Sequence, residues 1–420
     1  MTAQLKLSTP KGYEALTTDS VISYLSGSKN VSIRLGGKSS QWTSREVGDG
    51  NLNLVFIVKG LEDSVVVKQA LPYVRLVGES WPLPLSRAHY EHMALIEQAR
   101  WAEEFVPQVY EHDDIMALTV MEYLSPHIIL RKGLIQGVKY PHMAEHLGKF
   151  LARTLYHTSV LYLSADEKKV KAGAFQTNTA MCKISEDLIF DEPYFAAPMN
   201  RHTSPQLDNI ALQFQQDTEL KIAVQEMKWR FINNAEAMVH GDLHTGSVMV
   251  TENDTCVIDP EFAFYGPIGF DTGAILANMF MAYFSQAGHD NDADYAGWIL
   301  RQAENIWQVF VDEFVTLAAR RGKEILRGDV LNPRLCDDVS RVQEAAIKNR
   351  LEIIWSDTLG FAGCKIIRRI LGLAHVEDFE SIKDSDIRAQ CERKALDFAR
   401  KLLVRRADFK NIADVTKAAA

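Results

Sequence analysis

The sequence predicts an α+β protein with two lobes, a small antiparallel β lobe followed by a larger, mostly helical lobe. Strand-like runs are concentrated in the first third of the chain, and helical periodicity dominates the remainder. The length of 420 residues also exceeds the size at which a single hydrophobic core stops growing. We place the lobe boundary near Leu124, which gives domains over 1–124 and 125–420.

Short β-branched runs predict the strands of the first lobe. Leu54–Val58 and Val65–Lys68 flank turn residues and predict a β-hairpin. Ile115–Glu122 predicts one further buried strand, which ends before a Ser-Pro pair. Apolar residues at helical spacing predict helices in the second lobe, over 142–163, 306–319 and 388–403.

The composition is that of an ordinary soluble protein, with 47% hydrophobic and 24% charged residues. No run approaches the roughly 18 uncharged apolar residues of a membrane span, and no signal-like segment opens the chain. The five scattered cysteines argue against a disulfide framework or a structural zinc site. A net charge of −9 gives no reason to expect nucleic acid or anionic membranes as partners. We therefore expect a cytoplasmic protein.

The most informative segment is HGDLHTGS at 240–247, which is followed by DPE at 259–261. Phosphoryl transfer needs a carboxylate that orients the attacking hydroxyl, and hard oxygen ligands that hold Mg²⁺ between the phosphates. Asp242 lies 17 residues before Asp259, with two short predicted strands between them. Each motif alone is compatible with a turn or a solvated strand end, but this spacing is typical of a kinase catalytic loop and its metal aspartate. We predict Asp242 as the base, and Asp259 with Glu261 as the metal ligands.

Two residues of this segment leave alternatives open. Ser247 stands five residues after Asp242, where kinases usually have an asparagine that holds a second metal, so the number of metal ions stays open. His244 lies beside aspartates and suggests a metallohydrolase, but the motif lacks the ligand cluster of a zinc hydrolase. We favour a structural, hydrogen-bonding role for this histidine.

The run GDGNLNLV begins at Gly48 and compares with the kinase glycine-rich loop. Gly48 and Gly50 are present, and Asn53 replaces the third glycine. Small residues let a hairpin close over phosphates, where backbone N–H groups act as donors, and Asn51 adds a side-chain amide. Lys68 closes an apolar strand twenty residues after Gly48, and an ATP phosphate is the expected partner of its charge.

A glutamate on the following helix usually steers such a lysine. Glu91 is the candidate partner of Lys68, with Glu97 as the alternative. The backbone of the segment between the lobes is expected to pair with the adenine edge. That hinge is predicted at Glu122, Tyr123 and Leu124.

Six runs extend the comparison beyond a general kinase signature: EVGDGNLN (46–53), ESWP (79–82), ILRKGLI (129–135), HGDLHTGS (240–247), IDPEFAFYGPIGFD (258–271) and IIRRILGLAHVEDFESI (366–382). On these runs the sequence closely resembles the 5-methylthioribose kinases, the plant-type enzymes above all, over roughly 46–414. The resemblance implies a protein-kinase-like fold and the cofactors ATP and Mg²⁺. It also implies phosphorylation of the 1-hydroxyl of 5-methylthioribose to the 1-phosphate, a step of methionine salvage.

The resemblance further implies roles for individual residues. Asp242 is implied as base and substrate contact, and Arg368 and Arg369 match the paired arginines at the sugar site. The loop around Trp81 matches one near the active site, and the family forms homodimers. With the motifs above, the predicted ATP-binding set is Gly48, Gly50, Asn51, Lys68, Glu122, Tyr123, Leu124, Asp259, Pro260 and Glu261.

Helical periodicity by itself gives a different interpretation of the arginine pair. Lys365, Arg368 and Arg369 lie opposite an apolar face, which is the pattern of an ordinary solvated helix surface. Only the resemblance assigns the two arginines to the substrate. Asp271, which precedes an apolar helix, is expected to be a helix cap or a brace for the catalytic loop.

Three other functions are weighed against this one. A related phosphotransferase acting on aminoglycosides or choline would need an acidic pocket for its cationic substrate, whereas this site contains Arg368 and Arg369. A protein kinase is disfavoured because no A-P-E triplet follows the DPE motif. A non-catalytic, kinase-like binding protein would tend to lose Asp242, Asp259 or Lys68, and all three are present.

Overall fold

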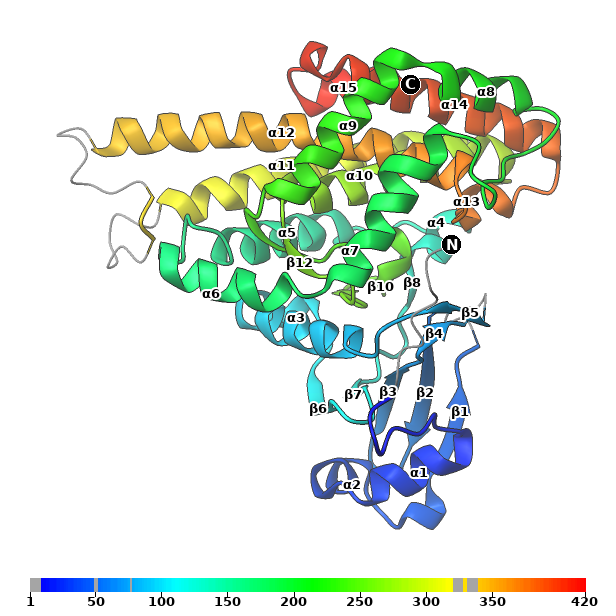
Figure 1. Cartoon of the computed structure of the whole chain (residues 1–420), viewed down its shortest axis with the longest axis vertical. Coiled ribbons are helices and arrows are strands. Elements are labelled where there is room, and N and C mark those ends of the chain that lie inside the picture. The colour runs from blue at the N-terminus through cyan, green and yellow to red at the C-terminus, as the bar shows by residue number, and fades with distance from the viewer. Residues whose placement is uncertain (1–8, 49–51, 76–77, 320–327, 331–338) are drawn as a thin grey trace. The chain divides into compact units, whose positions relative to one another are not determined.

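The chain is described here by a computed structural model that covers residues 9–48, 52–75, 78–319, 328–330 and 339–420. It divides into two compact units (Figure 1). The first comprises Met1–Pro126 together with Ile258–Phe262, and the second comprises His127–Val257 and Ala263–Ala420. The predicted α+β class is confirmed, with an antiparallel sheet in the first unit and helices dominating the second.

The first unit is built on a five-stranded antiparallel sheet of order β1-β2-β3-β7-β6. The predicted hairpin is confirmed as β2 and β3, and its register sets Val55 opposite Lys68. Alternate β-branched residues of β3, such as Val65 and Val67, are fully buried, as the pleat of a strand requires. The strands are β1 (Thr43–Glu46), β2 (Asn53–Lys59), β3 (Ser64–Ala70), β6 (Val109–Asp113) and β7 (Leu118–Glu122).

Three helices and a short hairpin complete the first unit (Figure 1). Thr17 and Ser28 cap the first two helices with their hydroxyl oxygens, which accept otherwise unpaired backbone N–H groups. The apolar residues of these helices join the core of the sheet, and the third helix packs against β3, β6 and β7. The elements are α1 (Thr18–Ser26), α2 (Lys29–Leu35), β4 (Tyr73–Val74), β5 (Gly78–Pro82) and α3 (Arg87–Ala102).

The strand predicted over Ile115–Glu122 begins later, at Leu118, so this prediction was wrong at its start. The carboxylate of Asp113 accepts the backbone N–H groups of Ile115 and Met116, at 2.8 and 3.0 Å. Such a side-chain turn competes with strand pairing and reverses the chain between β6 and β7. The predicted strand began too early because Ile115, Met116 and Ala117 are apolar, although they lie in the turn before β7.

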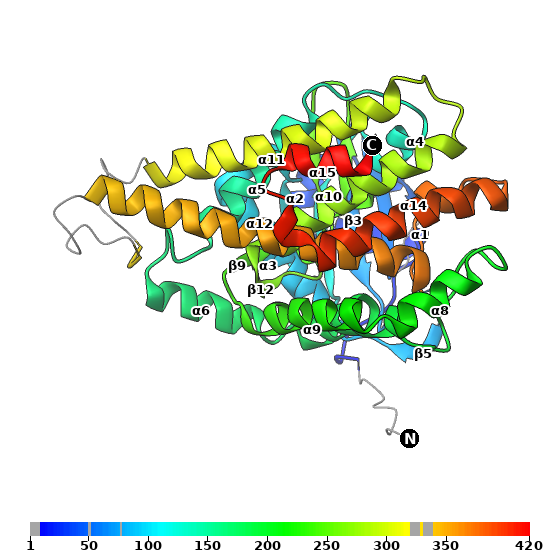
Figure 2. The ribbon, with the colours of Figure 1, turned by 90° about the horizontal axis from the view of Figure 1, so that it is seen from above.

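The second unit is a helical assembly around α10, which is buried at nearly every position (Figure 2). A helix that is apolar all round must be surrounded by others, and α10 contacts α11, α12 and α14. The predicted helices are confirmed as α5, α11 and α14, although α5 ends at His157 rather than at 163 and α11 begins at Tyr295 rather than at 306. The helices are α4 (Leu130–Ile135), α5 (Met143–His157), α6 (Ala165–Phe175), α7 (Thr179–Ser185), α8 (Asp208–Gln216), α9 (Thr218–Asn233), α10 (Ile268–Ser285), α11 (Tyr295–Ala319), α12 (Val339–Leu371), α13 (Glu377–Glu380), α14 (Ser385–Val404) and α15 (Ile412–Ala419).

In the described part of the second unit, two small antiparallel sheets flank the segment 240–247, which is predicted to be catalytic. One has the order β11-β10-β8, and the other pairs β12 with β9. Strand β9 leads into residues 240–247, and β12 leads into α10. Because β9 and β12 pair, the start of segment 240–247 lies beside the start of α10. The strands are β8 (Ile128–Ile129), β9 (Ala237–Val239), β10 (Val248–Val250), β11 (Thr255–Val257) and β12 (Phe264–Gly266). In the parts of the chain that the structure covers, no helix is both long and apolar enough to cross a membrane.

Candidate active site

In the first unit, Lys68 lies among three carboxylates, of which Glu91 and Glu261 are buried and Asp259 is partly exposed. Its ammonium donates a hydrogen bond to Glu91 Oε1 at 2.7 Å, and it also contacts the carboxylate of Asp259. Glu97, the alternative partner, instead pairs with Arg100 on the next turn of α3 at 3.0 Å. The structure therefore decides between the two glutamates in favour of Glu91.

The charges in this group shift one another's ionisation. Burial alone would lower the pKa of Lys68, but Asp259, Glu91 and Glu261 outweigh it and raise this pKa. Burial, reinforced by the carboxylates of Asp259 and Glu261, raises the pKa of Glu91. The group thus contains three crowded carboxylates, whose charge the ammonium of Lys68 offsets in part.

Glu91, Asp259 and Glu261 each offer an oxygen within 4.8 Å of the others. Hard carboxylate oxygens are the donors that Mg²⁺ prefers, so this set fits the predicted metal. Asp259 adopts a left-handed backbone conformation with φ of 72°, which non-glycine residues rarely adopt. Strained backbone of this kind is concentrated at functional sites.

Arg87 and Asn53 hold Glu261, an arrangement that sequence reasoning missed. Arg87 is 1% exposed, and its Nε lies 3.2 Å from Glu261 Oε2. Asn53 donates to the same oxygen at 3.0 Å and accepts from Arg87 Nη2 at 3.0 Å. The residue in place of the third loop glycine therefore ties the start of β2 to Glu261.

The remaining predicted ATP contacts are only partly described. Gly48 ends a described segment, whereas Gly50 and Asn51 lie outside the described residues. Strand β7 ends at Glu122, and Tyr123 and Leu124 follow it directly. Pro260 lies between the two predicted metal ligands, and Trp81 lies on β5. The roles of these residues stay predictions.

In the second unit, Asp242 faces a cluster of cations on α12. Its Oδ1 lies 3.2 Å from Lys365 Nζ and 3.3 Å from Arg368 Nη2, and its Oδ2 lies 3.9 Å from Arg369 Nη2. Lys365 is only 3% exposed and Arg368 only 6%. The interpretation of this helix face as solvated was therefore wrong.

The physical reason is the packing of α12, which contacts α10 on one side and α14 and α9 elsewhere. A helical wheel separates apolar from polar residues, but it does not show that neighbouring helices cover both faces. Lys365 also lies over the ring of Phe270, with Nζ 4.2 Å from the ring centroid, a favourable cation–π distance. The resemblance pointed to the two arginines, and the sequence signal for Lys365 was its place with them inside a long apolar stretch.

The cations determine the ionisation of Asp242. Burial alone would raise its pKa, but Lys365, Arg368 and Arg369 outweigh burial and hold this pKa well below the usual range. Asp242 is therefore a carboxylate throughout the physiological pH range. An ionised carboxylate accepts hydrogen bonds only, so it is suited to orienting a hydroxyl group.

His244 has the structural role favoured from sequence. Its Nδ1 hydrogen-bonds with Ser247 Oγ at 3.1 Å, and its Nε2 lies 3.5 Å from Asp242 Oδ2. Burial, reinforced by nearby arginines, lowers the pKa of His244 well below its usual value. Among the described residues His244 belongs to no group of three metal-ligating side chains. Ser247 also donates to the backbone carbonyl of Asp242 at 3.3 Å, which closes the loop on itself.

Asp271 braces the start of the loop 240–247. Of its two predicted roles, helix cap or loop brace, the structure shows the second. Its carboxylate accepts the backbone N–H groups of His240 at 2.6 Å and Gly241 at 3.1 Å. It lies in the first turn of α10, one turn after the capping Pro267. Because Asp271 is buried, these two bonds fix the backbone that presents Asp242.

These groups are of the kinds that a phosphotransferase needs: the second unit holds an ionised carboxylate among cations, and the first unit holds clustered carboxylates that suit a metal. Residues 43–304 match the phosphotransferase enzyme family. The sequence is 46% identical over 410 residues to methylthioribose kinase 1 of Oryza sativa subsp. japonica, covering 96% of this chain and 95% of that protein. It is 44% identical over 417 residues to methylthioribose kinase of an Escherichia coli O45:K1 strain, covering 98% and 99%.

The chain therefore belongs to the methylthioribose kinase family, a family of small-molecule kinases. Among solved structures, a glucosamine kinase in complex with glucosamine, ADP and inorganic phosphate aligns over 94% of this chain and 88% of that chain. The identity to it is 14% and the TM-score is 0.47.

Proposed function

We propose that this chain transfers the γ-phosphoryl group of ATP to the 1-hydroxyl of 5-methylthioribose, giving 5-methylthioribose 1-phosphate in methionine salvage. The observation that carries the substrate assignment is the 46% identity to a methylthioribose kinase across 96% of the chain. Similarity of this extent covers both units, including the helix that bears the cations around Asp242.

In this proposal the first unit binds the nucleotide. Lys68 holds the phosphates and Glu91 steers it, a role supported by their 2.7 Å contact. Asp259 and Glu261 hold Mg²⁺, which neutralises phosphate charge when bound. The loop bearing the two glycines covers the phosphates, and the backbone of 122–124 pairs with adenine.

The second unit presents the sugar. Asp242 accepts a hydrogen bond from the 1-hydroxyl and aligns its oxygen for attack, and Asp271 keeps the loop in place. Lys365, Arg368 and Arg369 offset negative charge as the phosphoryl group is transferred. The surroundings of Asp242 are therefore electropositive, which suits a neutral sugar that becomes an anion.

The same charge balance argues against the alternative substrates. An aminoglycoside or choline would carry its own positive charge towards the three cations that surround Asp242. A non-catalytic binding protein would not need to keep Asp242, Asp259 and Lys68 together. The homodimer is proposed on the family resemblance alone.

Coupled ATP turnover with different acceptors tests the substrate assignment. We expect kcat/KM for 5-methylthioribose to exceed that for ribose by about 10²-fold, because an apolar pocket gains a few kcal/mol from the methylthio group. Choline and kanamycin should give no turnover above the background of ATP hydrolysis. Equal rates with ribose, or a preference for either cationic acceptor, would refute the proposal.

Replacing Lys365 by methionine tests the cationic support of Asp242. Burial, reinforced by Arg368 and Arg369 and opposed by Asp242, lowers the pKa of Lys365 to about 8. Lys365 therefore carries its charge below pH 8 and loses it above. Wild-type kcat/KM should fall as pH rises through 8, whereas Lys365→Met should be about 10- to 100-fold less active at pH 7 and lack this decline.

The matched control is Lys183→Met on α7, where the side chain is 62% exposed and pairs with Asp187. It should keep the wild-type pH profile. A Lys365→Met enzyme with wild-type activity at pH 7 would show that this lysine does not act on the reaction.

A further inference from the structure

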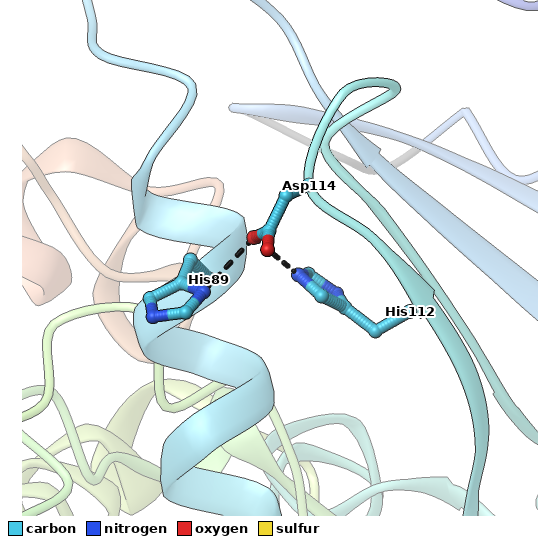
Figure 3. A group of neighbouring side chains, drawn as sticks. All are labelled: His89, His112 and Asp114. Atoms are coloured by element: carbon cyan, nitrogen blue, oxygen red, sulfur yellow. Dashed lines mark hydrogen bonds and ion pairs between the residues drawn. The ribbon is translucent and has the colours of Figure 1, made fainter.

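A second group of metal-ligating side chains lies in the first unit, apart from the charges around Lys68. His89 comes from the first turn of α3, His112 from β6, and Asp114 from the turn that follows β6. Both imidazoles converge on one oxygen of Asp114, His89 through Nδ1 at 2.9 Å and His112 through Nε2 at 3.0 Å (Figure 3). None of these three residues has a part in the proposed reaction.

The three donor atoms have the spacing of a metal site. They all lie within 4.8 Å of one another. Ligands that bind one tetrahedral Zn²⁺ at 2.0–2.1 Å are about 3.3 Å apart, so small side-chain rotations would accommodate an ion. Two imidazole nitrogens and one carboxylate oxygen suit Zn²⁺ and similar borderline ions, whereas Mg²⁺ prefers an all-oxygen set.

The neighbouring residues orient His112 and leave His89 and Asp114 accessible to solvent. His112 Nδ1 hydrogen-bonds with Thr119 Oγ1 at 2.9 Å, and Thr119 is 1% exposed on β7. This bond occupies the nitrogen that points away from Asp114 and directs Nε2 towards it, as second-layer contacts do at metal centres. The ring of His92 stacks on that of His112, with centroids 4.2 Å apart and planes 5° apart.

Exposure differs among the three ligands in a way that fits an open site. The side chain of His112 is 8% exposed, whereas those of His89 and Asp114 are 43% and 67% exposed. One ligand is therefore fixed in the protein, and two are reachable from solvent. A water molecule would complete the coordination from the open side.

We propose that His89, His112 and Asp114 bind one borderline divalent cation of the Zn²⁺ class. Such an ion links α3 to the turn between β6 and β7. It thereby restrains the helix that carries Glu91, the partner of Lys68, two residues beyond His89. The proposed ion clamps the nucleotide-binding unit and takes no part in phosphoryl transfer.

Binding is tested on tag-free protein that has been treated with chelator and dialysed. Zn²⁺ is titrated by calorimetry with Mg²⁺ in excess, so that sites made of carboxylates alone are already occupied. We expect one Zn²⁺ per chain, with at least 10-fold weaker binding in His89→Ala and in Asp114→Asn. The Co²⁺-loaded protein should show a visible absorption band that both variants lose.

Two control variants locate the site. His202→Ala removes a histidine that pairs with Asp208 at 2.8 Å but belongs to no three-ligand group among the described residues. Cys256→Ala disrupts a separate candidate group of His127, Asp254 and Cys256. Both should bind Zn²⁺ as the wild type does.

Because both test residues are substantially exposed, we expect their variants to fold, and circular dichroism checks this. Absence of Zn²⁺ binding by the wild type would overturn the proposal, as would full binding by either His89→Ala or Asp114→Asn. Loss of binding in Cys256→Ala alone would place the ion at the other group and equally overturn it. Since no readout uses phosphoryl transfer, the result is independent of the proposed function.

Discussion

Replacing Asp242 by asparagine is expected to lower kcat about 10³-fold. The amide keeps the shape of the side chain but removes the charged acceptor that orients the attacking hydroxyl, and such groups contribute about 10²- to 10⁴-fold. Because the surrounding cations hold the pKa of Asp242 well below its usual range, the wild-type carboxylate stays ionised at mildly acidic pH. The defect of the variant should therefore be the same at pH 6 and pH 8, apart from the effect of Lys365.

The same substitution should also lower stability. Lys365 and Arg368 are buried, and asparagine removes the carboxylate with which both form ion pairs. Removing one partner of a buried pair is strongly destabilising, here by about 2–4 kcal/mol in the free energy of unfolding. Activity should accordingly be measured well below the melting temperature of the variant.

Single-turnover kinetics with saturating ATP, together with denaturant unfolding, measure both effects. Asp208→Asn is the matched control, because Asp208 is 53% exposed and pairs with His202 on the surface. It should retain wild-type turnover and stability. Activity of Asp242→Asn within tenfold of the wild type would show that the hydroxyl acceptor is misassigned.

Asp259→Asn should lower kcat by about 10²- to 10³-fold and raise the Mg²⁺ concentration needed for half-maximal rate. A metal ion that neutralises phosphate charge is worth several kcal/mol, and each 1.4 kcal/mol is a factor of ten in rate. Asparagine tolerates the left-handed conformation of this residue, so the backbone should persist.

In contrast to Asp242→Asn, this variant should keep its stability. Lys68 retains Glu91 as a partner, and the loss of one carboxylate relieves repulsion within the group. Asp63→Asn serves as the control, since Asp63 is 45% exposed and pairs with Arg34 on the surface. Unchanged turnover and an unchanged Mg²⁺ requirement in Asp259→Asn would remove this residue from the metal site.

Local patterns predicted much of the fold and some of the site. The β2–β3 hairpin follows from β-branched runs around turn residues, and α5, α11 and α14 follow from helical periodicity. The pairing of Lys68 with Glu91 was one of two alternatives. These features depend on residues close in sequence, or on motifs whose spacing is tied to a reaction.

The features that sequence reasoning missed depend on contacts between distant segments. Arg87 is an unremarkable cation at the start of a helix until the chain brings Glu261 to it. Lys365 looked solvated because periodicity reports one helix at a time, whereas several helices cover α12. Identifying such residues would have required knowing which elements pack together.

The short stretch Ile258–Phe262 has a consequence for how the protein is made and how it evolves. During synthesis, the N-terminal sheet emerges from the ribosome long before the carboxylate that neutralises Arg87, so its charges stay unbalanced until most of the chain has been translated. Exchanging N-terminal halves between related genes would likewise combine Arg87 and residues 258–262 from different proteins. The first unit is therefore not continuous in sequence, and its charge pairs cannot be completed until residues 258–262 have been made.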